Sequence, residues 1–297
     1  MAQFLTPDDI DFAFCMQQTD SDHRIRAAKE YADDVIAYFH AGGIEVGAKL
    51  PWRNAEGKIR FRPHEVTVWG GFNGHGKSLV LGQVMMHFMR NRERVCIASM
   101  EMKPVMTLQR MCRQAAGKVP DVEYIRDFHL HTDGLLWLYD QQGTINGEKV
   151  AAVIRFAVDK FQITHFVADS LLKFGYAEDD YSGQKHFVDL LCAIARDTGV
   201  HIHLVHHSRK GKDEYAIPNK HDMKGSSSII DQVDNLIIVW KNKKKEEEMQ
   251  AGNNTKASEP DAVLVVEKQR NGEWEGKMNF YFDPLGRMLV ESQNYGF

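Results

Sequence analysis

The chain has 297 residues, of which 43% are hydrophobic and 26% charged, and its formal net charge is -4. This composition is typical of a globular protein with a sizeable core, and the length suits one large α/β domain with a small appendage. The negative balance gives no overall attraction to a polyanion, so nucleic acid could be bound only by a local basic patch. No apolar run is long enough to cross a membrane, and the N-terminus lacks the features of a signal peptide, so we expect a cytoplasmic protein without membrane contact.

The cysteines are far apart and form no C-x-x-C pair. Their spacing argues against a disulfide framework and against a cysteine-based zinc site. We expect reduced, mostly buried thiols at Cys15, Cys96, Cys112 and Cys192.

Residues 1–43 are predicted to form a helical N-terminal arm. Apolar side chains recur at helical spacing over 21–41, and a second short helix is predicted over 7–18. The arm either packs on its own core or docks on a neighbouring subunit, and the sequence leaves both readings open. Residues 44–297 are assigned to one domain, which begins with an irregular or hairpin segment over 44–64.

From residue 65 onward, short apolar runs typical of strands alternate with helical segments. This alternation predicts βαβ units and a largely parallel sheet covered by helices on both faces. The strands are expected at 65–69, 95–99, 164–169, 200–207 and 234–240, and the helices at 78–91, 104–116, 147–161 and 183–197.

The end of the chain has a different pattern. Apolar runs joined by turn sequences predict antiparallel hairpins at one edge of the sheet. The run KKKEEE over 243–248 is interpreted as a solvated turn. The hairpin strands are expected at 262–269, 277–282 and 287–291.

The segment GFNGHGKS, residues 71–78, matches G-x-x-x-x-G-K-[ST] at each fixed position and lies between a predicted strand and a predicted helix. Glycines let the backbone curl so that its N–H groups point inward, and the following helix adds its positive N-terminal end. The Lys77 ammonium group can reach the β and γ phosphates, and the Ser78 hydroxyl is a ligand for Mg²⁺. We therefore predict a site for a nucleoside triphosphate with Mg²⁺. Its residues are Gly71, Asn73, Gly74, His75, Gly76, Lys77, Ser78 and Leu79.

Two acidic residues follow predicted strands. Asp169 ends the apolar run THFVAD, where a carboxylate can reach the Mg²⁺ shell; the alternative is an aspartate that only caps a turn. Hydrolysis of ATP needs one more acid, because a water must be oriented or deprotonated for attack on the γ phosphorus. Glu101, just past the strand over 95–99, has the right kind of position.

The order of these motifs resembles the RecA-like ATPase core of DnaB-type replicative helicases, and it is similar to the helicase half of phage primase-helicases. In chain order the motifs are the phosphate loop, SMEMKP, FVADSLL, LVHHSRK, MKGSSSIIDQVDNLII and EKQRNG. The resemblance spans roughly residues 50–291, and the set is more specific than any one motif. It implies a RecA-like P-loop NTPase core, with a mostly parallel twisted sheet flanked by helices.

The resemblance also implies roles for residues of the ATP site. Lys77 and Ser78 would hold the phosphates and Mg²⁺, and Asp169 would support the metal. Glu101 would be the catalytic base. His207 stands where the family places a polar sensor that touches the γ phosphate and relays its state to the DNA-binding loops.

A further implied role belongs to the KQRNG segment. Arg270, paired with Lys268, would enter the ATP site of the neighbouring subunit. A planar guanidinium suits this role because it can neutralise the charge that spreads over the γ phosphoryl oxygens. ATP hydrolysis would then require a ring, which we expect to be a homo-hexamer. The alternative is a surface arginine in a hairpin.

The histidines of HIHLVHH, within 201–207, also raise the question of a metal site. His201 and His203 share one face of a strand, and His207 joins them only if the strand is unbroken. No carboxylate or cysteine lies beside them, so we prefer the sensor role for His207 over zinc. His206 is the register-dependent alternative for the sensor.

In a RecA-like ring, loops after the catalytic strands would grip DNA in the central channel. Of two such loops, 174–185 is acidic, whereas 208–228 combines cations with glycines and serines. These groups suit phosphate contacts without base readout, as in sequence-independent single-strand binding. A solvated loop without this role is the alternative. The predicted DNA contacts are Arg209, Lys210, Lys212, Lys220, Lys224, Gly225 and Ser226.

The sequence therefore favours a ring-forming, ATP-dependent DNA helicase motor that moves along single-stranded DNA in replication. A RecA-type recombination or repair ATPase that forms filaments on DNA shares the loop and both acids, and it is the main alternative. A signalling or scaffolding ATPase without nucleic acid is the third class. The segment before the phosphate loop is too short for a typical independent domain, so a primase or loader would be a separate protein.

Overall fold

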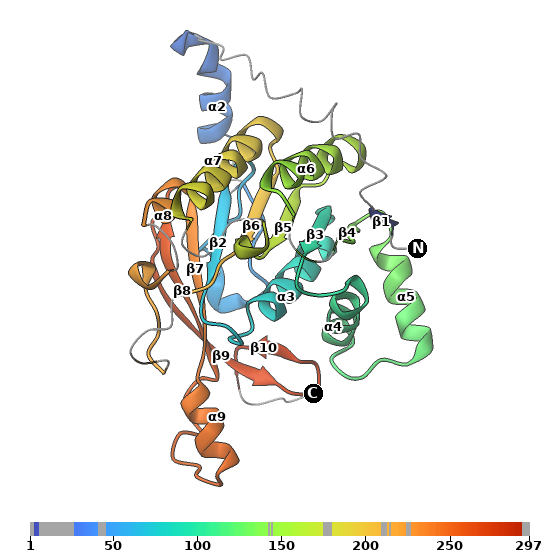
Figure 1. Ribbon diagram of the computed structural model, residues 1–297, viewed down its shortest axis with the longest axis vertical. Helices are drawn as coiled ribbons and strands as arrows, with labels where there is room; N and C mark the ends of the chain where they lie inside the picture. Colours follow the sequence, from blue (N-terminus) through green and yellow to red (C-terminus); the bar gives the residue numbers. More distant parts are fainter. Residues whose placement is uncertain are drawn as a thin grey trace.

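The computed structural model of the chain describes residues 3–5, 27–40, 46–141, 143, 145–174, 180–208, 213, 215–223 and 227–292. The described strands form one ten-stranded sheet in the order β1-β4-β3-β5-β6-β2-β7-β8-β9-β10, with helices on both faces (Figure 1). From β1 to β7 all neighbours are parallel, and β8, β9 and β10 join antiparallel at one edge. The mostly parallel sheet and the C-terminal antiparallel strands agree with the predicted fold.

The bounds of the elements follow the predicted runs closely. The helices predicted over 104–116 and 147–161 are confirmed at both ends. The strands are β1 (Gln3–Leu5), β2 (Val66–Gly70), β3 (Val95–Ser99), β4 (Leu136–Tyr139), β5 (His165–Asp169), β6 (His201–Val205), β7 (Asn235–Lys241), β8 (Ala262–Gln269), β9 (Gly276–Asp283) and β10 (Met288–Val290). The α-helices are α2 (Ala32–His40), α3 (Lys77–Arg90), α4 (Pro104–Ala116), α5 (Val122–Thr132), α6 (Gly147–Phe161), α7 (Tyr181–Thr198), α8 (Ser227–Gln232) and α9 (Lys243–Gln250).

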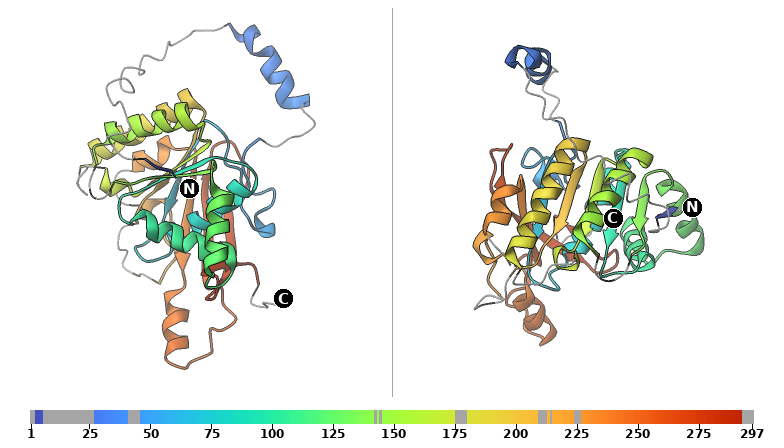
Figure 2. Two further views of the ribbon diagram at one scale, coloured as in Figure 1. Left: turned by 90° about the vertical axis from the view of Figure 1, so that its right-hand side faces the viewer. Right: turned by 45° about the horizontal axis from the view of Figure 1, so that its top comes forward.

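The sheet has an apolar core on each face, because successive side chains of a strand point to opposite sides. On β3, Cys96 and Ala98 belong to the core formed with α6 and α7. Val95 and Ile97 belong to the core formed with α3 and α4. The views of Figure 2 show α6 and α7 side by side on one face of the sheet. This two-sided cover explains why the central strands are apolar throughout.

The interpretation of KKKEEE as a solvated turn is wrong, because these residues form helix α9. The side chain of Asn242 caps the helix by accepting from the Lys245 N–H at 3.0 Å. Lys245 is buried, and its Nζ lies 2.7 Å from Oδ1 of Asp261. This ion pair joins the helix to a residue distant in sequence, so a local charge pattern could not predict it.

Two strands and the helices α5 and α8 were also absent from the sequence prediction. Strand β1 pairs in parallel with β4 at the edge of the sheet, so part of the predicted arm belongs to the domain. Both strands are very short, with three and four residues, and they carry little periodic signal.

The described part of the N-terminal arm is helix α2 with the short 3-10 turn Ala28–Tyr31 before it. Figure 2 shows that α2 stands apart from the sheet. Val35 and Ile36 are 51% and 55% exposed. The helix predicted over 7–18 lies outside the described residues. None of the described helices is long and apolar enough to cross a membrane.

The strand histidines form a buried polar group within the core on the α3 side. His203 Nδ1 accepts from Trp69 Nε1 at 3.1 Å, and its Nε2 lies 3.2 Å from His165 Nδ1. His201 Nε2 lies 2.8 Å from the Thr67 hydroxyl. In the part of the chain that the structure describes, no three or more His, Cys, Asp or Glu side chains are grouped to hold a metal. Burial lowers the pKa of all three histidines, that of His201 to about 4.

Lower pH should therefore destabilise the protein. An unfolded histidine has a pKa of about 6.5, so the unfolded chain takes up protons below that pH while these folded histidines stay neutral. The free energy of unfolding should fall as the pH decreases from 7.5 to about 5.5, as measured by urea denaturation. Replacing one of the three, His165→Gln, should remove about a third of the histidine-dependent slope.

The same exchange at exposed His221 is the matched control. A slope that is equally large in the His165→Gln variant would contradict the assignment of this pH dependence to the buried group.

Candidate active site

The predicted site residues lie where neighbouring parallel strands end. β2 ends at Gly70 just before the phosphate loop, and β5 ends at Asp169. Glu101 and His207 each follow the last residue of their strand by two positions. Because parallel strands present their carboxyl ends at one edge of a sheet, these segments meet there. They line one cavity of about 520 Å³.

Three glycines give the phosphate loop its path from β2 to α3. Gly71, Gly74 and Gly76 have φ angles of 141°, 78° and 85°, which other residues avoid. A Cβ at Gly71 would lie 2.3 Å from the carbonyl oxygen of Val239, so no side chain fits there. Gly76 is the N-cap residue of α3, and Lys77 therefore begins the helix.

The Lys77 side chain folds back over the loop. Its Nζ donates to the carbonyl oxygens of Gly71 at 2.9 Å and Phe72 at 3.0 Å. Burial lowers the pKa of Lys77 to about 8, so the group is still charged at neutral pH. A buried cation inside a ring of backbone groups can bind an anionic phosphate.

Ser78 and Asp169 are in direct contact. The Ser78 hydroxyl donates to Oδ2 of Asp169 at 2.6 Å. Burial raises the pKa of Asp169. A hydroxyl and a carboxylate side by side fit Mg²⁺, which takes oxygen ligands and is usually held by one or two protein groups together with phosphates and water. These two residues could therefore hold the ion.

Glu101 contacts two groups of the same edge. Its Oε1 accepts from the Ser170 hydroxyl at 2.8 Å and lies 3.8 Å from Nε2 of His207. The His207 ring is the main cause that lowers the pKa of Glu101 to about 2, and the Ser170 hydroxyl adds to it. A carboxylate with so low a pKa is a weak proton acceptor, so it is better suited to orienting a water than to deprotonating it.

The structure separates the two candidates for the sensor. His207 lines the cavity. His206 is fully buried and is not among the described residues that line it. His207 escapes the strand because β6 ends at Val205.

Two arginines of the cavity were missed by the sequence analysis. Arg110 lies on α4, and Arg287 lies in the turn between β9 and β10. Gln114 Nε2 donates to the Arg287 carbonyl oxygen at 3.1 Å, which ties this turn to α4. The only local signal for Arg110 is a cation on the helix after Glu101. Arg287 has none, because only the hairpin brings it to the cavity.

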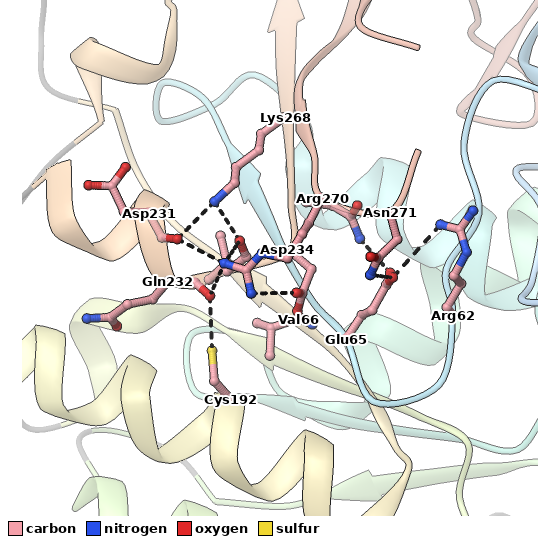
Figure 3. A network of polar contacts seen from close by, with 12 residues as sticks. Arg62, Glu65, Val66, Cys192, Asp231, Gln232, Asp234, Lys268, Arg270 and Asn271 are labelled. Atoms are coloured by element: carbon pink, nitrogen blue, oxygen red, sulfur yellow. Dashed lines mark hydrogen bonds and ion pairs between the residues drawn. The ribbon is translucent and has the colours of Figure 1, made fainter. Parts of the chain in front are cut away.

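Lys268 and Arg270 lie elsewhere in the chain, at the end of β8 (Figure 3). Neither is among the described residues that line the cavity. Arg270 Nη1 lies 3.1 Å from Oδ1 of Asp234. The terminal nitrogens of both side chains also bind carbonyl oxygens that follow or end α8, which Figure 3 shows; these belong to Ile230, Asp231, Gln232 and Val233. Both cations therefore cap the C-terminal end of α8 in their own chain.

The predicted DNA loop starts beside the cavity. Ser208, directly after His207, donates its N–H to the Gly71 carbonyl at 3.0 Å and forms a bridge with Met223. Lys220 is exposed, and its N–H donates to Glu267. The remaining predicted contacts lie outside the described residues, namely Arg209, Lys210, Lys212, Lys224, Gly225 and Ser226.

The strand order, the loop between β2 and α3 and the aspartate at the end of β5 define a RecA-like ATPase fold. Among solved structures, the chain is similar to the ATPase domain of a phage helicase, with a TM-score of 0.74 and 12% identity over 91% of this chain and 100% of that one. It is also similar to "The Structure Of A DnaB-Like Replicative Helicase And Its Interactions With Primase", with a TM-score of 0.71 and 12% identity over 92% of this chain and 69% of that one. No protein-family model and no curated protein sequence matches the chain. The fold that the motif order implied is thus confirmed.

The packing at Gly71 predicts an unequal response to alanine in the phosphate loop. Gly71→Ala should lower the free energy of unfolding by about 3 kcal/mol or more, because its Cβ would overlap the backbone of β7. Gly74→Ala should cost about 1 kcal/mol, since its φ is positive but a Cβ there meets nothing. Urea denaturation measures both; equal losses would show that the contact with Val239 is not the limiting constraint.

Proposed function

We propose that the chain is an ATP-driven DNA helicase motor that acts on single-stranded DNA in replication. The observation that supports this most strongly is the meeting of Lys77, Ser78, Asp169, Glu101 and His207 at one cavity. The cavity lies in a fold shared with helicase ATPase domains. Each group has the chemistry that phosphoryl transfer to water requires.

The residues of the chain divide the reaction between them. Lys77 and the loop bind the phosphates, and Ser78 with Asp169 holds Mg²⁺, which neutralises phosphate charge when bound. Glu101 orients the attacking water. The contact between His207 and Glu101, at 3.8 Å, lets the sensor respond to the same group that positions the water.

Coupling to DNA runs through the residue after the sensor. Ser208 is bonded to Gly71 in the phosphate loop and bridges to Met223. A shift of His207 toward or away from a phosphate would therefore move both ends of the loop over 209–222. The cations predicted on and beside this loop are proposed to contact the DNA phosphates.

The active unit is proposed to be a hexameric ring of identical subunits. Lys268 and Arg270 lie outside the cavity of their own chain, which supports a role in the site of the next subunit. The exposed apolar side chains of α2 favour docking of the arm on a neighbour. A primase or loader is proposed as a separate partner.

An unwinding assay tests this function. The protein with ATP and Mg²⁺ should separate a forked DNA duplex, and particle images with single-stranded DNA and a non-hydrolysable ATP analogue should show closed rings. Open filaments would favour the RecA-type recombinase instead. ATPase activity that single-stranded DNA does not stimulate, without retention on that DNA, would favour an ATPase that does not act on nucleic acid.

A mixing experiment tests the arginine in trans. Arg270→Ala should keep ATP binding but reduce hydrolysis by about 10³- to 10⁵-fold, and Lys77→Ala should abolish hydrolysis while remaining folded. A mixture of the two should recover activity, because each Arg270→Ala site can receive the arginine of a Lys77→Ala neighbour. No recovery would count against action in trans.

Asp234→Asn is the control for this experiment. It removes the ion pair with Arg270 but keeps the guanidinium. If it lost hydrolysis to the same extent as Arg270→Ala, the effect would come from loosening α8 rather than from a missing catalytic group.

A further inference from the structure

A second cavity adjoins the phosphate loop on the side away from Asp169 and Glu101. It measures about 660 Å³, and its walls come from the loop, the end of β7, helix α9 and the β9–β10 hairpin. Much of its lining is apolar, including Leu79, Val239, Met249, Phe282 and Leu289. The two cavities share four residues, Gly74, Gly76, Leu79 and Phe282. A molecule bound in one can therefore extend into the other.

His75, in the middle of the phosphate loop, lines this second cavity. It is only 2% exposed. Its Nδ1 accepts from the backbone N–H of Lys241 at 3.0 Å. Nδ1 is therefore unprotonated, and the neutral ring carries its proton on Nε2. Burial lowers the pKa of His75 to about 4, which keeps the ring in this neutral form at physiological pH.

The Nε2–H of His75 has no acceptor within the described residues. Buried donors of this kind are nearly always paired, so one in the wall of a cavity points to a ligand that supplies the acceptor. The backbone contact to Lys241 fixes the ring, and Phe72 packs against it with the ring centroids 5.3 Å apart. The donor is thus held in place before anything binds.

Helix α9 gives the cavity a fixed wall. The cap by Asn242 and the pair between Lys245 and Asp261 anchor it to the ends of β7 and β8. Lys241 Nζ also lies 2.6 Å from Oε1 of Glu246. Met249, 41% exposed, contributes the apolar surface of the helix to the cavity.

We propose that this cavity binds the nucleoside part of the triphosphate, and that the Nε2–H of His75 donates a hydrogen bond to an acceptor on it. The proposal rests on the proposed function, because the phosphates occupy the adjoining cavity. An apolar wall suits an aromatic base and disfavours an anion. Bases and riboses offer ring nitrogens and oxygens as acceptors, which the apolar wall does not. His75 is thereby a specificity-determining residue, and α9 is part of the substrate site.

Comparing two ligands isolates the nucleoside contribution. A non-hydrolysable ATP analogue carries a nucleoside, whereas inorganic tripolyphosphate carries only the phosphates. Wild-type protein with Mg²⁺ should bind the analogue more tightly than tripolyphosphate in calorimetric titration. If it binds both equally, the proposal is overturned; if it binds neither, the proposed function itself fails.

His75→Asn tests the donor. The asparagine Oδ1 can keep the bond to Lys241, but the side chain no longer reaches the position of Nε2. Affinity for the ATP analogue should fall about tenfold, with affinity for tripolyphosphate unchanged. His87→Asn, the same exchange on α3 away from both cavities, is the control. An unchanged preference for the analogue, or an equal loss for both ligands, would overturn the role of His75.

Met249→Ser tests the wall without touching the phosphate loop. It should lower affinity for the ATP analogue several-fold and leave that for tripolyphosphate unchanged, because only the nucleoside reaches α9. Lys244→Ala, exposed on the same helix and outside the cavity, should change neither. If Met249→Ser keeps the full preference, α9 is not part of the site.

Discussion

The carbonyl group of Gly71 holds the candidate site together. It accepts from the Lys77 ammonium group at 2.9 Å and from the Ser208 N–H at 3.0 Å, and its residue packs directly against the backbone of Val239. One peptide thus joins the phosphate loop, the end of β6 and the end of β7. Because His207 precedes Ser208, the position of the proposed sensor is tied to the loop that would hold the phosphates. Such a junction tolerates no side chain at residue 71, since all three backbones approach closely.

Around this junction the charged groups are balanced in pairs. Ser78 bonds Asp169, and Glu101 is in contact with His207. Lys268 and Arg270 stand outside this set and hold the end of α8 through backbone carbonyls and Asp234. They therefore have a structural role within the chain, beside the one proposed between chains. The helix that they cap follows directly on the predicted DNA loop, so both roles concern the same part of the molecule.

The two cavities beside the phosphate loop differ in chemistry. One is bordered by acids and cations and suits phosphates and a metal ion, and the other is mainly apolar with the buried donor of His75. The loop itself separates them. Helix α9, whose sequence is almost entirely charged, makes one wall of the apolar cavity because Lys245 turns inward to Asp261 while Met249 lies on the cavity side.

The sequence alone determined the loop, the order of strands and helices in the domain, and the acids that follow β3 and β5, because these are local signals: glycine spacing, apolar runs and the residues that end them. Arg110 could be noticed but not placed, and Arg287 carried no signal. Tertiary structure decided which side chains meet: His207 rather than His206 at the cavity, α9 as a helix instead of a turn, and Lys268 with Arg270 on α8. The physical reason is that these contacts join segments far apart in the chain. Their energies depend on burial and on distant partners, which no local pattern contains.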